Sequence, residues 1–233
     1  MSNHTYEIEI KSLLGNKENA HKLTQKMREK DANLQTIGSH KQLNHYFVPT
    51  TGSLKALLHK TQNVIDPKLK DRFKDIAEHA KDFSVRTRWA DGKVLLVVKA
   101  SVDDTTSFNG TARLELESLT DLQLEELDKL VLNSGFEYQA KWSRERSEYK
   151  YHPSANEEVS VAIDKNAGYG HLAEFEMLAG DKEKAEEMKA RIREIMKELD
   201  AEELLQDRLA RMFDFYNRNW RDYYGTDKIF VIE

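Results

Sequence analysis

Charged and branched apolar residues alternate strictly near the N-terminus, and this pattern constrains the fold more than any other feature of the chain. Glu7, Glu9 and Lys11 alternate with Ile8 and Ile10. Successive side chains of a β-strand point to opposite faces, so the two isoleucines should face a core. The three charged side chains should then share the other face, about 7 Å apart along the strand. Carboxylates this close repel each other, which indicates either a compensating cation or the solvated face of an ordinary amphipathic strand.

Composition limits the classes of protein that need to be considered. The chain has 233 residues, of which 39% are hydrophobic, so it can bury a core in one large domain or two small ones. It contains no cysteine, which excludes disulfides and thiolate chemistry and suits a reducing cytoplasm. A net charge of −5 argues against a nucleic-acid-coating surface. The sequence shows neither a signal-peptide pattern nor a membrane-spanning apolar run. We therefore expect a cytoplasmic protein with no nucleic-acid or membrane partner.

Hydrophobic periodicity predicts an α+β chain in which strands and helices follow one another. Strands are expected at residues 6–13, 34–40, 43–48, 83–90, 93–101, 111–119, 136–151, 159–164 and 172–178, with a short closing strand at 229–232. Helices are expected at residues 16–30, 53–58, 66–80, 120–133, 181–199 and 201–216. Asp91-Gly92 and Asn109-Gly110 are typical of tight hairpins.

The opening pattern recurs on later strands, where charged residues again share one face and apolar residues the other. The acids of these faces are Glu7, Glu9, Glu115, Glu117, Asp164, Glu174 and Glu176. The bases are Lys11, Arg86, Arg88, Lys99, Arg113, Arg144 and Arg146. At least eight strands are enough to close a barrel, with helices outside it. We therefore predict a closed eight-stranded antiparallel β-barrel whose lumen is charged; the alternative is a solvent-facing lattice of salt bridges on an ordinary sheet.

A charged lumen would determine the chemistry of its ligands. Unpaired buried ions cost several kcal/mol each, so the acids would need divalent cations and the bases would need a polyanion. Oxygen ligands without a histidine or cysteine set favour Mg²⁺ or Mn²⁺. Arginines and lysines at several heights suit an elongated phosphate chain. The pattern thus points to a triphosphate bridged to the carboxylates by metal.

The ordered set of motifs resembles the CYTH superfamily, also called the triphosphate tunnel metalloenzymes. The matching segments are E-x-E-x-K at 7–11, L-x-x-Y-F at 43–47, R-x-R at 86–88, a strand ending at Lys99, R-x-E-x-E at 113–117, a basic strand at 144–149, and an aspartate, glycine loop and E-x-E at 164–176. Each motif is weak alone, but their order over residues 6–178 is specific. We expect a CYTH domain at residues 1–180 with a helical insertion at about 50–81, and a helical extension at 181–233 packed on the same domain.

The C-terminal extension allows two further interpretations. Its aromatic side chains could stack on a purine or thiamine ring, but packing of helices onto the sheet is the simpler explanation. The apolar stripe from Met188 to Leu199 could pack inside the chain or form a homodimer face.

The resemblance implies an enzyme that acts on a small triphosphate such as ATP, thiamine triphosphate or tripolyphosphate with two Mg²⁺ or Mn²⁺ ions. It implies catalytic roles for Glu7, Glu9, Lys11, Lys99 and Arg113. It implies phosphate binding by Lys11, Arg86, Arg88, Lys99, Arg113, Arg144 and Arg146, and metal binding by Glu7, Glu9, Glu115, Glu117, Asp164, Glu174 and Glu176. Hydrolysis is the leading expectation; the alternatives are a class IV-type adenylyl cyclase and a non-catalytic polyphosphate-binding module.

Overall fold

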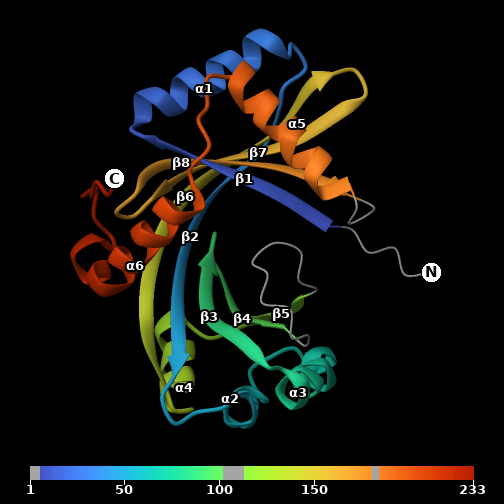
Figure 1. The fold of residues 1–233 in the computed structure, drawn as a ribbon. Helices are drawn as coiled ribbons and strands as arrows, with labels where there is room; N and C mark the ends of the chain where they lie inside the picture. The colour runs from blue at the N-terminus through green and yellow to red at the C-terminus, as the bar shows by residue number, and fades with distance from the viewer. Residues whose placement is uncertain (1–5, 102–112, 180–183) are drawn as a thin grey trace. The chain divides into compact units, whose positions relative to one another are not determined.

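Eight strands and six α-helices make up the described part of the chain, which comprises residues 6–101, 113–179 and 184–233 of a computed structural model (Figure 1). The strands are β1 (Tyr6–Gly15), β2 (Gln35–Pro49), β3 (Asp82–Ala90), β4 (Lys93–Ser101), β5 (Arg113–Thr120), β6 (Phe136–Ser154), β7 (Glu157–Asn166) and β8 (Gly170–Ala179). The helices are α1 (Lys17–Lys30), α2 (Leu54–Thr61), the 3₁₀ turn η1 (Pro67–Leu69), α3 (Lys70–His79), α4 (Leu124–Leu132), α5 (Ala185–Glu198) and α6 (Gln206–Tyr223). The α+β class agrees with the sequence pattern.

The strands form a sheet of order β1-β8-β7-β6-β2-β3-β4-β5, so β1 and β5 are its edges. The prediction of a closed barrel is therefore wrong. Closure requires hydrogen bonds between the first and last strands, and strand number alone does not supply them. At Lys11 the backbone carbonyl of β1 instead accepts a hydrogen bond from the N–H of Leu204, 2.7 Å away. A loop thus covers this strand at a position where a closing strand would pair.

Local sequence signals explain most element boundaries. The side chains of Asn16 and Ser53 accept hydrogen bonds from backbone N–H groups of the first turns of α1 and α2, as expected for N-caps. The capping box before α4 is formed by Gln123 with Glu126, so the helix starts at Leu124 and not at residue 120, where the sequence predicts it.

Two sequence signals for turns have different outcomes. The Asp91-Gly92 turn joins β3 to β4, and both residues have positive φ, as a tight hairpin requires. The Asn109-Gly110 signal lies outside the described residues. The predicted strands at 34–40 and 43–48 are one continuous strand, β2, because no turn residue interrupts them. The predicted closing strand at 229–232 is only a single bridge between Ile229 and Gly168.

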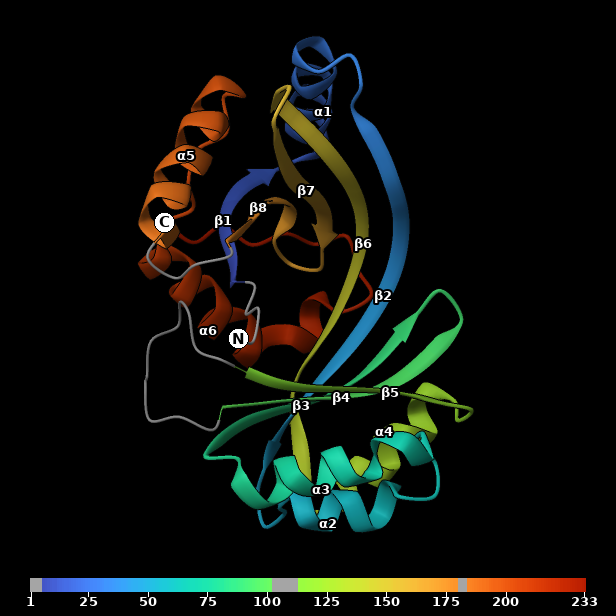
Figure 2. The ribbon, with the colours of Figure 1, turned by 90° about the vertical axis from the view of Figure 1, so that its right-hand side faces the viewer.

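The chain divides into two compact units. The first unit is Met1–Lys41 with Arg144–Glu233, and the second is Gln42–Ser143. In the first unit, α1 and α5 lie together on one side of β1, β7 and β8 (Figures 1 and 2). The buried side chains between these layers include Ile10, Phe175 and Ile195. The stripe on α5 is thus an intramolecular core face, because Ile192, Ile195, Met196 and Leu199 are all buried in it.

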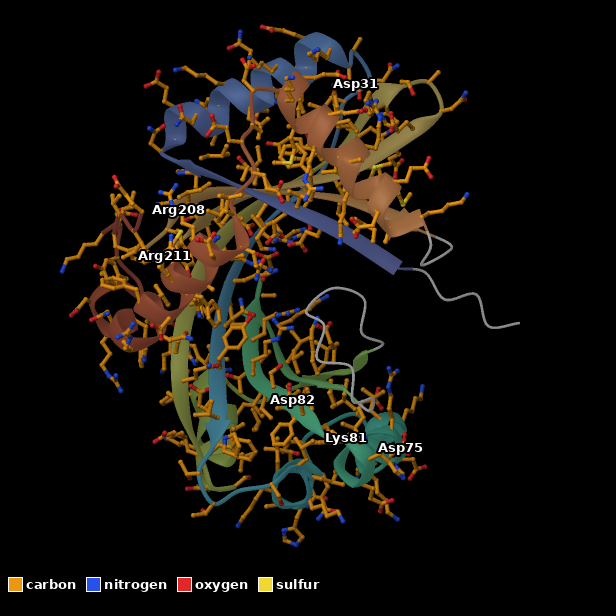
Figure 3. The ribbon with its side chains drawn as sticks, viewed as in Figure 1. Asp31, Asp75, Lys81, Asp82, Arg208 and Arg211 are labelled. Carbon is orange, nitrogen blue, oxygen red and sulfur yellow. The ribbon has the colours of Figure 1, made fainter. Side chains whose placement is uncertain are left out.

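Helix α6 packs by its aromatic side chains against the loop before β8. Tyr216 is fully buried and stacks on Tyr169 with ring centroids 5.8 Å apart. Gly168 has a φ of +77°, and a Cβ there would lie 2.7 Å from the Phe230 ring, so glycine is needed for this contact. Packing, not ring binding, therefore accounts for the buried aromatics. Arg208 and Arg211, labelled on α6 in Figure 3, donate to the backbone carbonyls of Ile232 and Glu233.

The second unit has its own core under β3, β4 and β5. Helices α2, α3 and α4 lie on one side of these strands (Figure 2). Phe73, Leu57 and Leu127 from the three helices meet Val85 and Leu96 of the sheet, all of them fully buried. The opposite side of the sheet carries the charged residues of the strands.

We expect Ile195→Ala to lower the free energy of unfolding by about 2–5 kcal/mol, because Ile195 is fully buried between α5 and the sheet. The matched control is Leu205→Ala, since Leu205 is 63% exposed and its truncation should change stability by less than about 0.5 kcal/mol. Urea unfolding of both variants measures the difference. Equal losses would contradict the intramolecular assignment of the α5 stripe.

Candidate functional site

In the first unit the strand register places the predicted charged residues on one face. Glu9 lies directly opposite Glu176, Lys11 opposite Glu174, and Arg146 opposite Asp164. Side chains of directly opposite residues point to the same side of a sheet. Pairs between these, such as Ile10 with Phe175, therefore point to the other side, where they join the core. Strand pairing thus gathers charged residues that are up to 167 residues apart in the sequence, as Glu9 and Glu176 are.

Five of these side chains form a connected network that we call the first-unit cluster: Lys11, Arg144, Arg146, Asp164 and Glu174. Arg146 binds Asp164 through two hydrogen bonds, of 2.8 Å from Nε and 2.7 Å from Nη2. The same Nη2 also contacts Glu174. Lys11 Nζ lies 3.1 Å from Glu174 Oε1 and also contacts Glu9, while Arg144 Nη1 lies 3.3 Å from Asp164. Lys11 and the two arginines therefore hold the carboxylates in place.

Burial and neighbouring charges shift the pKa values of Glu174 and Arg146 in opposite directions. Burial alone would raise the pKa of Glu174, but Lys11 and Arg146 outweigh it and hold that pKa below its usual value. Burial alone would likewise lower the pKa of Arg146, but Asp164 and Glu174 raise it above its usual value. Asp164 is only 1% exposed and lies under both arginines, a position that fixes their orientation. Their partners therefore favour the charged forms of Glu174 and Arg146.

The donor set of this face fits a hard divalent cation. Glu9 and Glu176 are carboxylates directly opposite each other on β1 and β8, and like charges in this arrangement repel. Glu174 lies two residues from Glu176 on the same face. All three offer oxygen ligands of the kind that Mg²⁺ and Mn²⁺ prefer. Among the described residues no three such groups are already gathered as a ligand set, since Glu9 and Glu174 contact bases instead.

The charged face of the second unit carries two arginines on β3. Arg86 lies opposite Tyr46 and donates a 3.0 Å hydrogen bond to its hydroxyl, with the guanidinium 5.4 Å from the ring centroid. Arg88 lies opposite Asn44, donates to its side-chain oxygen at 3.0 Å, and binds Glu117 at 2.9 Å. Each guanidinium thus has a partner on the neighbouring strand that orients it.

The other predicted residues of this unit are placed by the backbone. Lys99 is half-buried and lies opposite Glu115, and Arg113 lies opposite Ser101. Glu7 of the first unit lies opposite Leu178. The side chains of Glu7, Arg113 and Glu115 lie outside the described part of the structure, so their predicted roles stay predictions.

A buried polar network behind Arg86 and Arg88 was missed by sequence reasoning. Asp128 of α4 is 1% exposed and accepts a hydrogen bond from Thr87 Oγ1 at 2.5 Å. His45 Nδ1 and the Tyr138 hydroxyl each lie 2.7 Å from its other oxygen. Burial alone would raise the pKa of Asp128, but these three partners lower it. The available signal was an acid among the apolar residues Leu124, Leu127 and Val131 of α4.

Lys141, on β6, also belongs to this network. Its Nζ lies 3.7 Å from Asp128 Oδ2 and 4.1 Å from the centroid of the Tyr138 ring.

Family comparison identifies the chain from its sequence. The family model described as "CYTH domain" matches residues 5–208. The chain belongs to the CYTH family. This match confirms the resemblance, and it covers β1 through β8 together with α5. No curated protein matches the chain.

Solved structures share this CYTH fold at low sequence identity. A protein from Pyrococcus horikoshii OT3 is 20% identical with a TM-score of 0.52, covering 85% of this chain and 92% of its own. A conserved hypothetical protein from Pyrococcus furiosus is 19% identical with a TM-score of 0.52, covering 86% and 97%. A Vibrio parahaemolyticus protein, provisionally named an adenylate cyclase, is 13% identical with a TM-score of 0.53, covering 86% and 94%. At these identities the likeness concerns the fold alone.

Membrane insertion through a helix finds no support in the described residues. None of their helices combines the length and the apolar character that a transmembrane span needs.

The lowered pKa of Glu174 predicts a pH dependence of stability. A carboxylate with a lower pKa in the folded state stabilises the fold above its unfolded-state pKa of about 4.3, and this contribution is lost as the pH falls through the folded-state pKa. Glu174→Gln cannot ionise. The difference in unfolding free energy between wild type and this variant should therefore shrink as the pH falls from about 6 to about 3. Urea unfolding across this range measures it, and a constant difference would contradict the ion-pair network.

Proposed function

We propose that this CYTH protein is a metal-dependent triphosphatase that releases phosphate from a small triphosphate. The observation that carries the proposal is the first-unit cluster, in which bases that suit phosphate and carboxylates that suit metal share one face of β1, β6, β7 and β8. A lattice that served stability alone would need only balanced charge. Here Glu9 and Glu176 are opposed like charges, and a divalent cation between them would replace their repulsion with attraction.

Partner exchange would convert the ion-paired cluster into a binding site. Glu174 contacts both Lys11 and Arg146. A cation bound to Glu174 would weaken its attraction for these bases. The ammonium and the guanidinium would then donate to phosphate oxygens, with Arg144 and Arg146 kept in orientation by Asp164. Metal and triphosphate are therefore expected to bind more tightly together than either does alone.

The residues proposed to hold metal in this unit are Glu9, Glu174 and Glu176, with Glu7 next to them in the E-x-E-x-K motif. When bound, the metal would neutralise phosphate oxygens and lower the pKa of an attacking water. Phosphate binding is proposed for Lys11, Arg144 and Arg146 in this unit. In the second unit, Arg86, Arg88, Lys99 and Arg113 are proposed to bind phosphate from the motif pattern. Glu115, Glu117 and Asp164 stay predicted metal ligands from the motif pattern.

Hydrolysis in this scheme is attack of a water oxygen on the terminal phosphorus. The bond from that phosphorus to its bridging oxygen breaks, and the electron pair leaves with the diphosphate product. The water loses a proton to solvent or to a carboxylate of the face. Charge on the equatorial oxygens is spread over fixed cations, so catalysis comes from positioning and electrostatic stabilisation. Lys11 and Arg146 are the described bases best placed to supply it, because each already contacts a carboxylate that we propose as a metal ligand.

Hydrolysis is favoured over cyclisation because it demands less of the site. The first-unit cluster offers ammonium, guanidinium and carboxylate groups, which suit phosphate and metal. Cyclisation would also require groups that hold a ribose hydroxyl against the α-phosphorus, whereas water needs no such positioning. Cyclase activity is therefore the outcome that would replace the proposal.

Product analysis tests the reaction directly. Incubation with ATP, thiamine triphosphate and tripolyphosphate, each with Mg²⁺ or Mn²⁺, should release inorganic phosphate and leave the corresponding diphosphate. Chromatography resolves these products from pyrophosphate and cyclic nucleotide. Cyclic AMP with pyrophosphate would replace hydrolysis by cyclisation, and tight binding without product would indicate a binding module.

We expect Glu9→Gln to lower metal-dependent turnover by about 100-fold or more, because it removes a charged oxygen ligand while keeping the shape of the side chain. The control is Glu186→Gln, an exposed carboxylate on α5, the helix that packs on the apolar side of the sheet. Phosphate release measured under saturating metal should be unchanged in the control. Full activity of Glu9→Gln would remove Glu9 from the site.

A further inference from the structure

We infer that Asp128 is a positioning residue for phosphate binding, which it serves from the apolar side of the sheet by fixing the strand pair that carries Arg86 and Arg88. The inference rests on the proposed function, since it assumes that these two arginines bind phosphate. Asp128 touches neither arginine in any contact described above; it acts through Thr87, the residue between them.

The strand register shows why this one carboxylate can control both arginines. Thr87 lies directly opposite His45 on β2. The next pair on one side is Arg86 with Tyr46, and the next pair on the other side is Arg88 with Asn44. Adjacent pairs alternate between the two faces of the sheet. Asp128 therefore holds the central pair from the core side, and each flanking pair presents an arginine on the charged side.

The contacts of Asp128 join four elements at this point. Thr87 Oγ1 on β3 donates to one carboxylate oxygen at 2.5 Å. His45 Nδ1 on β2 and the Tyr138 hydroxyl on β6 each lie 2.7 Å from the other oxygen. An ionised carboxylate only accepts hydrogen bonds, so Nδ1 of His45 must carry the proton. Helix α4 is in this way bonded to three neighbouring strands, β6, β2 and β3, through a single side chain.

On the charged side of the sheet, the orientation of Arg86 and Arg88 depends on the register between β2 and β3. Arg86 reaches the Tyr46 hydroxyl at 3.0 Å, and Arg88 reaches the Asn44 oxygen at the same distance. Both acceptors belong to β2, so a small slip of β2 against β3 would break both bonds together. The His45–Asp128–Thr87 bridge opposes this slip because its two ends are on the same two strands. A buried carboxylate also tolerates little movement, since losing a partner leaves it unsatisfied in an apolar core.

A purely structural role for Asp128 predicts something different. The network would then stabilise the unit without affecting how the arginines meet a ligand. Loss of stability and loss of phosphate affinity would be independent, and the effect on affinity would not depend on whether Arg86 and Arg88 are present.

The experiment compares two matched variants, Thr87→Val and Thr87→Ser, in the full chain. Valine keeps the shape of threonine but cannot donate to Asp128, whereas serine keeps the hydroxyl. Binding of tripolyphosphate with Mg²⁺ is measured by calorimetry, and folding is checked by thermal melting. We expect Thr87→Val to weaken binding about fivefold to tenfold and Thr87→Ser to stay within about twofold of wild type. Asp128→Asn should resemble Thr87→Val.

The same substitutions in an Arg86→Ala/Arg88→Ala background provide the decisive readout. If Asp128 acts through the arginines, Thr87→Val should change affinity by less than about twofold there. Two results would overturn this inference and leave the proposed function standing. One is a loss of affinity from Thr87→Val that is as large in the arginine variant as in wild type, and the other is wild-type affinity in a folded Thr87→Val protein. Absence of tripolyphosphate binding by the unaltered chain would instead overturn the proposed function together with it. Should Thr87→Val and Asp128→Asn melt without cooperativity, Tyr138→Phe, which removes one hydroxyl donor, carries the same comparison.

Discussion

The charged face of the first unit depends on one buried carboxylate, Asp164, bound by two arginines. Taking an isolated charge out of water is expensive, and a carboxylate that is 1% exposed is stable only with partners of opposite charge. Arg146 meets it with two parallel hydrogen bonds, and Arg144 adds a third contact. These contacts fix the guanidinium planes, and Glu174 and Lys11 extend the network to β8 and β1. Balanced in this way, the face can carry acids and bases side by side.

This balance explains both the success and the failure of the sequence analysis. The sequence predicted which charged residues share a face of a strand, because side chains alternate strictly along a strand. The register between β1, β8 and β7 preserves this alternation across the sheet. The closed barrel was not readable. It was inferred from the number of predicted strands, which does not supply hydrogen bonds between the first and last strands of the sheet. Ion pairs such as Lys11 with Glu174 can neutralise charges within one face, so the charges do not require closure either. The Leu204 contact at the edge of β1 comes from residues 201–205, which the sequence predicts as the start of a helix but which precede α6 as a loop.

The placement of candidate residues could be predicted only for those on strands. Motif spacing predicted a shared charged face for Glu9, Lys11 and Arg146, because side chains alternate along a strand, and their roles stay predictions. Asp128 was not predicted, because a single acid on the apolar face of a helix is no distinct signal in the hydrophobic pattern. Its meaning depends on His45 and Thr87, which lie more than 40 residues away in sequence and meet it only through sheet pairing.

Arg146 of the first unit and Arg86 of the second have different kinds of described partner, whereas Arg88 combines both kinds in Asn44 and Glu117, and the difference bears on ligand binding. Arg146 is held by carboxylates, which compensate its charge, so phosphate must compete with Asp164 and Glu174 unless a cation occupies the acids. The contacts described for Arg86 include a hydroxyl and an aromatic face, which orient the guanidinium and carry no charge of their own. A neutral partner reduces the attraction between the guanidinium and phosphate less than a carboxylate does, but it also binds the guanidinium less strongly. Orientation by neutral partners therefore requires rigid strands behind it, and the buried Asp128 network supplies that rigidity from the opposite side of the sheet.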